Sequence, residues 1–387
     1  MITGAVLVIM GCKETNPAYC PAHGEDPSCG SIDAPTTTDA PIATPCSDNL
    51  GCKSAIAPVC DISGGAGVCV LCTATDHALC KDTTPICADH MCQACRNASD
   101  CPLSAVCLAS GACADEGDVA YVDPMGSATT SCTKALPCMT VASGLATVTA
   151  LGTPRPYLKL HGAIDEAVTI ARDVAVFADP DTTLTRESGG PILTVTGTAV
   201  VEINDLTITR SHLGIDPGIL TDGTTALTLK RVKISESKGH GVSCAGNSLT
   251  VSGSTFSDNG LAGISCSKGS VAVTTSTFTK NFRGGLVLAG GSFDVTNNFV
   301  YDNGDKDSSD VGGVFVNPMA GTMNRFEFNT VIDNHARDFP TVLSAGLICD
   351  VPSFAAANNL VARNDVAGDV HRSNANIGGR CTYPTSA

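Results

Sequence analysis

Two carboxylates, Glu236 and Asp258, have a spacing that could support acid–base chemistry. They lie 22 residues apart in a row of charged residues that continues with Lys280. If the chain repeats its path with that period, the two carboxyl groups stack about 5 Å apart, near the separation that retaining glycosidases use. Two carboxyl groups at that distance can divide the roles of acid and base. The alternative, which we favour, is a solvated row of charges that Lys280 neutralises.

A second candidate site is an acidic loop that could hold calcium, which prefers carboxylate oxygens as ligands. The alternative is an ordinary acidic surface loop, since its order of residues differs from that of an EF-hand. We expect no cofactor other than calcium at this loop. The four aspartates of the loop are Asp302, Asp305, Asp307 and Asp310.

The elements that would position these residues follow from a repeat of about 22 residues, which becomes regular after residue 155. Each repeat contains three short segments of alternating polarity, separated by Gly and Asn, which is typical of a parallel β-solenoid. Successive coils then stack about 4.8 Å apart, so that like side chains lie on like. One interior column consists of Ile208, Ile234, Phe256, Phe278, Val300, Val331 and Val361.

A column of asparagines marks one bend of each coil. We expect these residues to adopt left-handed backbone and to join through their amides to the asparagine one coil away. Before the first regular coil, Thr140 to Thr149 is predicted to form a short helix that covers the open end. The asparagine column consists of Asn259, Asn281, Asn303, Asn334 and Asn364.

This pattern resembles the pectate-lyase-like right-handed parallel β-helix family over about 250 residues. The resemblance implies an all-β fold with a capping helix, and it implies no single activity because enzymes, adhesins and tailspikes share the scaffold. A lyase of this kind would place calcium-binding carboxylates near a catalytic Arg or Lys. The acidic loop at 302–310, with His335 and Arg337 in the next insertion, is the corner where such chemistry would lie.

The segment Gly239-His240-Gly241 resembles the G-H-G motif of polygalacturonases, in which the histidine serves the catalytic aspartates. Those enzymes also have N-T-D and D-D motifs upstream and an R-I-K motif downstream, and these companions are missing from this sequence. The repeat explains the segment equally well, because Ala262 and Gly284 occupy the position of His240 in the next coils. We therefore favour a structural role for His240.

Twelve cysteines in residues 46–113 form three units of four, which resemble tandem four-cysteine repeats in large secreted proteins of some soil bacteria. Without Cys12, the 21 cysteines leave an even number, as expected for ten disulfides in an oxidising compartment. The C-x-x-C pairs at 69–72 and 92–95 also match zinc-ribbon spacing. Zinc would leave eight cysteines of the units unexplained, so we favour disulfides.

The predicted β-helix contains six more cysteines, whose positions predict three disulfides. The first two bracket a loop, and the next two lie 22 residues apart in one column of adjacent coils. The last two would join the final coils to the tail and fix the C-terminal cap. The expected pairs are Cys132–Cys138, Cys244–Cys266 and Cys349–Cys381.

The first residues indicate export. The apolar run 4–10 is too short to span a bilayer but suits a signal peptide, and Gly11-Cys12 resembles a bacterial lipobox. We expect cleavage before Cys12, lipid on its thiol as the only membrane contact, and a place at the outer membrane or cell surface. The predicted segments are a signal peptide at 1–11, an anchor and Pro/Thr-rich linker at 12–45, the cysteine repeats at 46–113 and the β-helix at 119–387.

The net charge of −15 argues against nucleic acid as a partner, because phosphates would be repelled. We expect a surface lipoprotein whose β-helix binds a polysaccharide or a protein partner without catalysis, since grooves along stacked strands suit extended chains. The alternative is a polysaccharide lyase or glycosidase. It would act through the 302–338 corner or through Glu236 and Asp258.

Overall fold

The structure, a computed structural model, forms two compact units, Met1–Gln93 and Ala94–Ala387. Cys12, Cys381 and the predicted signal peptide lie outside the described residues. Within the described part, no helix has both the length and the apolar character needed to cross a membrane. The structure describes residues 44–128, 131–147, 156–211, 214–246, 248–319, 322, 324–337, 344–350, 356–367 and 376–380.

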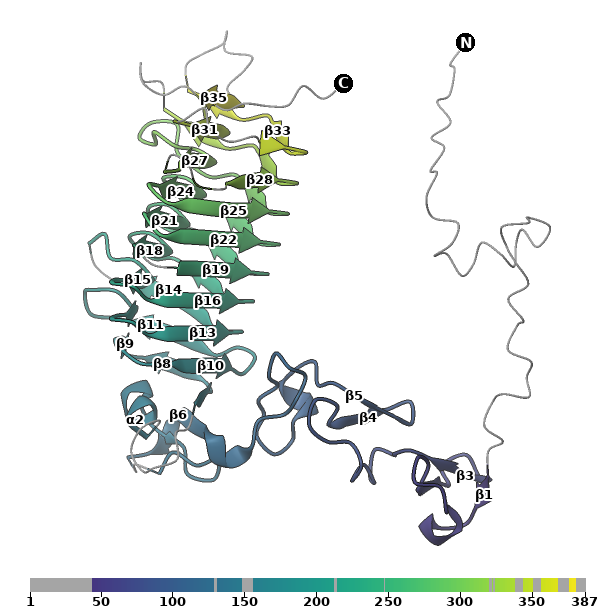
Figure 1. Ribbon diagram of the computed structural model, residues 1–387. Helices are drawn as coiled ribbons and strands as arrows, with labels where there is room; N and C mark the ends of the chain where they lie inside the picture. Colours follow the sequence, from purple (N-terminus) through teal and green to yellow (C-terminus); the bar gives the residue numbers. More distant parts are fainter. Residues whose placement is uncertain are drawn as a thin grey trace, which may run out of the picture. The chain divides into compact units, whose positions relative to one another are not determined.

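The second unit is a right-handed parallel β-helix built from three long sheets (Figure 1). The first sheet contains ten strands in this order: β6 (Val119–Ser127), β7 (Tyr157–Leu160), β10 (Val174–Ala178), β13 (Val200–Asn204), β16 (Ala226–Lys230), β19 (Ser248–Ser252), β22 (Ser270–Thr274), β25 (Ser292–Thr296), β28 (Arg325–Glu327) and β32 (Ala356–Ala357). The first two strands, β6 and β7, are consecutive in the chain. From β7 onward, each strand pairs with the corresponding strand of the next coil. This arrangement confirms the predicted fold class.

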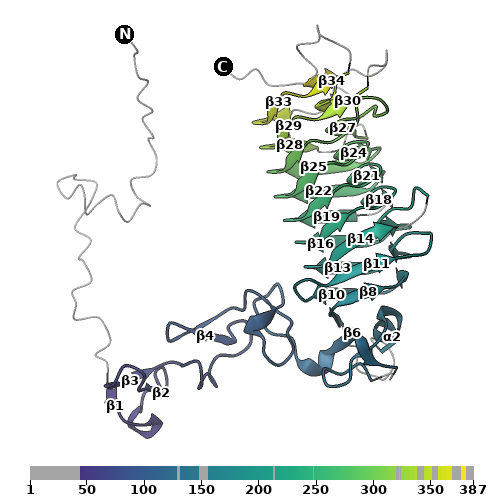
Figure 2. The same ribbon diagram turned by 180° about the vertical axis from the view of Figure 1, so that it is seen from behind.

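The other two long sheets contain nine strands each (Figure 2). The second sheet consists of β8 (Ala163–Asp165), β11 (Thr183–Arg186), β14 (Thr207–Ser211), β17 (Lys233–Ser235), β20 (Thr255–Ser257), β23 (Thr277–Thr279), β26 (Phe299–Tyr301), β29 (Thr330–Ile332) and β33 (Leu360–Ala362). The third sheet consists of β9 (Val168–Ile170), β12 (Leu193–Val195), β15 (Ile219–Thr221), β18 (Val242–Ala245), β21 (Ile264–Ser267), β24 (Leu286–Ala289), β27 (Val314–Asn317), β31 (Leu347–Cys349) and β35 (Ile377–Gly379).

The strand register confirms the predicted period of 22 residues. Ile234 pairs with Phe256, and Phe256 pairs with Phe278, so the apolar column stacks in the interior. All three side chains are fully buried, and the two phenyl rings stack with centroids 4.9 Å apart. Because adjacent residues of a strand point to opposite faces, the residues on either side of this column point outward.

The asparagine column forms the expected ladder, but its backbone conformation differs from the prediction. The amides of Asn259 and Asn281 each donate to the side-chain oxygen of the asparagine one coil on, at 2.8 Å. The left-handed backbone lies at the residue before each asparagine, and before Ser237 in the same column, with φ of 55 to 57°. Each asparagine points into the interior to hydrogen-bond, so the solvated residue before it makes the bend. These residues are Glu236, Asp258, Lys280, Asp302, Asp333 and Arg363.

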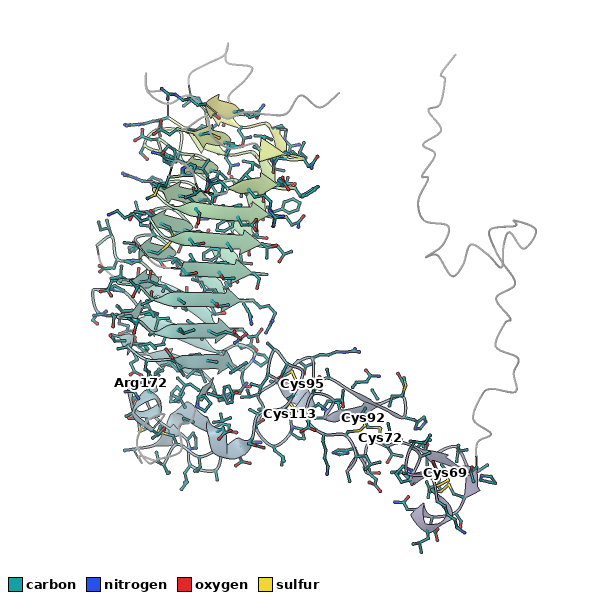
Figure 3. All side chains as sticks on the ribbon, in the orientation of Figure 1. Cys69, Cys72, Cys92, Cys95, Cys113 and Arg172 are labelled. Carbon is teal, nitrogen blue, oxygen red and sulfur yellow. A yellow bond between two sulfur atoms is a disulfide. The ribbon has the colours of Figure 1, made fainter. Side chains whose placement is uncertain are left out.

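The predicted capping helix is α2 (Val141–Thr147), which covers the first coil. Val141 and Leu145 are buried. A charged side chain hydrogen-bonds the backbone at each end of the helix. The carboxylate of Glu166 accepts from the backbone N–H groups of Val141 and Ala142 at 2.7 and 2.9 Å. Arg172 donates to the carbonyl of Leu145 at 3.1 Å, beside α2 in Figure 3. Opposite charges at the two ends complement the helix dipole.

The cysteine units share one disulfide pattern, in which the first cysteine bonds the third and the second bonds the fourth. The first two units lie in the unit Met1–Gln93, where they form two small antiparallel sheets. The strands are β1 (Pro45–Cys46), β3 (Gly67–Val70) and β2 (Val59–Asp61) in one sheet, and β4 (Ile86–Ala88) and β5 (Met91–Gln93) in the other. The bonds are Cys46–Cys60, Cys52–Cys69, Cys72–Cys87, Cys80–Cys92, Cys95–Cys107 and Cys101–Cys113 (Figure 3).

The third cysteine unit belongs to the same compact unit as the β-helix. Val106 and Ala114 form a second small core with Tyr121 and Phe177. Tyr121 and Phe177 stand on the outer face of the first sheet, because their neighbours in the strands point into the main core. The Tyr121 hydroxyl also donates to the carbonyl of Ser104 at 3.0 Å. Outward aromatic residues therefore attach this unit to the first coils.

Two of the three disulfides predicted for the β-helix are present among the described residues. Disulfides join Cys132 to Cys138 and Cys244 to Cys266, and the second of these pairs links directly opposed residues of β18 and β21. Cys349 is buried and disulfide-bonded. Disulfide bonding as a general feature of this chain is therefore confirmed.

Candidate functional site

A groove of 530 Å³ lies at the bend that follows the second sheet. It spans three consecutive coils, those of β14, β17 and β20. Every residue that lines it is charged, hydroxylated or glycine. The lining residues are Arg210, Ser211, Glu236, Ser237, Lys238, Asp258 and Gly260. Such a lining offers hydrogen-bond donors and acceptors.

The structure brings the two predicted carboxylates, Glu236 and Asp258, into this groove. The residues before them, Ser235 and Ser257, are paired in β17 and β20, so the carboxylates belong to adjacent coils. Arg210, from the coil before, donates to Glu236 with its Nε 3.3 Å from Oε2. The charged row therefore begins with Arg210, one coil earlier than the predicted first member, Glu236. The step of 26 residues from Arg210 to Glu236 equals the step from Ile208 to Ile234, which is the signal that locates Arg210.

Two of the four predicted calcium ligands, Asp305 and Asp310, are held by separate partners. One carboxylate oxygen of Asp305 accepts from the side-chain hydroxyl of Ser308 at 2.8 Å and from the backbone N–H groups of Asp307 and Ser308 at 3.0 Å. The Ser308 hydroxyl and these N–H groups lower the pKa of Asp305. Asp310 accepts from Arg337 at 2.6 Å, so Arg337 is engaged in an ion pair.

The acidic loop does not form a converged set of oxygen ligands. In the described ranges, the groups of three potential ligand atoms within 4.8 Å of one another consist only of disulfide-bonded cysteines. Calcium binding by Asp302, Asp305, Asp307 and Asp310 stays a prediction. The sequence could not show that Asp305 closes its own turn, because that turn lies in an insertion outside the repeat.

A network around His335 lies beside this loop. Strands β30 (His335–Ala336) and β34 (Asp365–Val366) pair, and they bring the His335 Nδ1 into contact with the Asp365 carboxylate. Lys306 lies 2.9 Å from the same carboxylate, and Asp302 lies 3.9 Å from the other ring nitrogen of His335. Burial opposes ionisation of Asp365, but the hydrogen bonds from Lys306 and His335 outweigh it and hold its pKa below the ordinary value. Asp365 was not predicted from the sequence to belong to this corner.

His240 occupies a structural position between coils. Its Nδ1 accepts from the backbone N–H of Ala262, one coil on, at 3.1 Å. Burial lowers the pKa of His240, and the nearby Arg283 lowers it further. The flanking glycines are required by backbone stacking, because a Cβ on Gly239 would lie 1.9 Å from the carbonyl oxygen of Ile215. The G-H-G sequence therefore has a sufficient structural explanation.

The contribution of His240 to stability is expected to depend on pH. Because the pKa of His240 is lowered in the folded chain, a proton binds the unfolded chain more readily than the folded one. The stability that the neutral ring contributes is therefore fully present above the unfolded pKa of about 6.5, and it declines as pH falls through the lower folded pKa. We expect His240→Ala to lower the free energy of unfolding by about 1 kcal/mol at neutral pH. His240→Asn, which keeps an acceptor and does not titrate, should lose less.

Urea unfolding at about pH 7.5 and about pH 5 measures this difference. On acidification, both variants should lose less stability than the parent chain. An equal loss in all three proteins would show that the His240 ring does not need to be neutral.

The comparison with protein families agrees with the architecture. Residues 191–375 match the family model described as right handed beta helix region. No curated protein matches the sequence. A solved structure titled "Crystal structure of pectate lyase Pel9A" is 13% identical, with a TM-score of 0.47, and the match covers 68% of this chain and 73% of that one.

Proposed function

From this right-handed parallel β-helix, we propose a binding protein that holds an extended polysaccharide along its coils without cleaving it. The observation that supports this proposal is the polar groove, which crosses three consecutive coils and contains both cations and anions. Lys238 and Arg210 can donate to sugar hydroxyls, and Glu236 and Asp258 can accept from them. Charged groups make stronger hydrogen bonds than neutral ones, so four of them in one groove suit a hydroxyl-rich ligand.

Binding without cleavage is favoured because three of the candidate catalytic side chains are already bound to other groups of the protein. Glu236 is salt-bridged to Arg210, and Arg337 is salt-bridged to Asp310. His240 accepts a hydrogen bond from the next coil. A lyase or glycosidase remains the alternative, and the same groove would be its substrate site.

The test is a panel of neutral and acidic polysaccharides, titrated against the full chain and assayed in parallel for new reducing and unsaturated ends. We expect binding without product. Lys238→Ala and Asp258→Ala should each weaken binding about tenfold, the effect of losing one hydrogen bond to a charged group. Arg325→Ala serves as the control, because Arg325 is an exposed cation salt-bridged to Asp294 in the first sheet.

Two results would contradict the proposal. Product release that disappears in Asp258→Ala would establish the enzymatic alternative. Equal binding by all three variants would place the ligand elsewhere.

We also propose that the chain acts outside the cytoplasm, anchored through lipid on Cys12. Eight disulfides among the described residues support an oxidising compartment. The apolar run before Cys12 supports export. Labelled palmitate should enter the chain in cells and be lost from Cys12→Ser, and incorporation that survives the substitution would refute the anchor.

A further inference from the structure

Exposed aromatic and aliphatic side chains gather on the second sheet in its last three coils. Phe299 and Leu360 are 52% and 58% exposed, and they stand in one outward column, on either side of Thr330. Tyr301 and Ile332 are neighbours in the parallel column. Phe328, 55% exposed, lies two residues before β29. We call this surface, formed by Phe299, Tyr301, Phe328, Ile332 and Leu360, the aromatic face.

The fold does not require apolar side chains at these positions. In the earlier coils the same two outward columns hold mainly hydroxylated residues, while the interior residue between them is always apolar. The interior is already filled by Val300 and Val331 in the last coils. Exposed apolar groups gathered in one place on a soluble surface mark an interaction site. The earlier outward residues are Thr207, Thr209, Lys233, Ser235, Thr255, Ser257, Thr277 and Thr279.

The charge of the surface indicates what it binds. The outward residues of β26, β29 and β33 include no charged side chain, although the whole chain has a net charge of −15. The bends that follow these strands carry Asp302, Asp333 and Arg363, of which Arg363 is already salt-bridged to Asp333. An acidic polymer would therefore find no cation among the outward residues of the strands and would be repelled by the chain as a whole. An uncharged ligand with apolar faces and hydroxyl edges fits aromatic rings that stand beside threonine hydroxyls. Hexose rings have these properties.

The aromatic face continues the polar groove along the coils. Asp258, in the groove, directly follows β20, and Phe299 begins β26, two coils further on. Two coil spacings amount to about 10 Å. A linear polysaccharide that runs parallel to the coil axis can therefore contact both surfaces. Tyr301 and Thr279 pair directly in this direction, so the surface between the two sites is unbroken.

We propose that the aromatic face is a stacking platform for uncharged sugar rings of the polysaccharide that occupies the groove. This inference rests on the proposed function, and it adds the ligand class, a neutral hexose polymer, and the direction in which the polymer lies. Phe299 and Tyr301 lie side by side on β26, at one level of the coil axis, so their rings pack against the apolar face of the polymer at that level. The groove residues hydrogen-bond the hydroxyls further along the same chain.

The experiment titrates the full chain with soluble oligosaccharides of glucan, mannan and galactan, and with an oligouronate of equal length. We expect at least one neutral series to bind more tightly than the oligouronate. Phe299→Ala and Tyr301→Ala should each raise the Kd about tenfold, as expected for loss of a buried aromatic contact. Phe299→Tyr, which keeps a ring, should bind like the parent chain.

Phe315→Ala is the matched control, because Phe315 is a half-buried outward aromatic residue in β27 of the third sheet. It should bind like the parent chain, and circular dichroism should show that every variant is folded. Unchanged binding in Phe299→Ala and Tyr301→Ala, with weakened binding in Asp258→Ala, overturns the platform and leaves the groove in place. Unchanged binding in all three overturns both proposals.

Two further outcomes overturn the platform in other ways. A preference for the oligouronate contradicts the neutral ligand. A parent dimer that Phe299→Ala converts to a monomer, seen by analytical ultracentrifugation, assigns the aromatic face to a second copy of this chain.

Discussion

Asn281→Ala is expected to destabilise the β-helix by about 3 kcal/mol or more. Asn281 is fully buried, and its amide donates to the carbonyl of Phe256 at 3.0 Å and to the side-chain oxygen of Asn303 at 2.8 Å. Its own side-chain oxygen accepts from the amide of Asn259 at 2.8 Å. Alanine removes these bonds and the one that the backbone N–H of Asn259 donates to the same oxygen at 3.4 Å. Buried groups of the two adjacent coils therefore lose hydrogen bonds, and each group left unsatisfied costs about 1–3 kcal/mol.

Urea unfolding followed by circular dichroism measures this loss. Asn297→Gly is the control, since Asn297 is an exposed asparagine with φ of 57° that glycine tolerates well. Its effect should stay within about 0.5 kcal/mol, as for most surface substitutions. If Asn281→Ala cost no more than the control, the ladder would be a consequence of stacking and not a source of stability.

The interior of the β-helix could be predicted from the sequence because stacking imposes the same environment on every coil. Ile234, Phe256 and Phe278 recur at a fixed step, and the register places them one above another. The same logic located Cys244 opposite Cys266. A period read from side chains therefore determines which residues are vertical neighbours.

The bends between strands were harder to predict, because more than one residue type can make the hydrogen bonds that a bend needs. A second ladder runs through Asn298, Asn329 and Asn359, with side-chain bonds of 3.0 and 3.1 Å. In earlier coils its positions are Ser254 and Ser276, whose hydroxyls accept from or donate to the backbone instead. A column that changes from serine to asparagine shows no repeated letter, so the ladder was missed.

The candidate site was predicted only as far as it follows the repeat. Glu236 and Asp258 obey the period and lie together, whereas the partners of Asp305 and Asp310 lie in insertions whose contacts the period does not determine. The cysteine units show the same limit. Four cysteines allow three pairings, and nothing in their spacing selects the first–third and second–fourth bonds that the structure contains.

Reduction is expected to unfold residues 44–93 while the β-helix stays folded. The buried side chains of that segment are Cys52, Val59, Cys72 and Cys80, so apolar packing without the disulfides is almost absent. Each bond closes a loop of 12 to 17 residues, and its loss costs about 3 kcal/mol. The β-helix has instead a continuous interior from Ala120 to Ala356.

Hydrogen exchange with and without a thiol reductant, read by mass spectrometry, tests this expectation. Protection should vanish in 44–93 and persist in β19, β22 and β25, and a protease should then release an intact β-helix. A metal chelator must be present, because three sulfurs of each cysteine unit lie within 4.8 Å of one another and reduced thiols at that spacing could bind zinc. If protection survived reduction when the chelator is left out, but not when it is present, these units could replace their disulfides by a bound metal. Protection that survives with chelator would mean that the segment is stabilised by contacts other than its sulfur bonds.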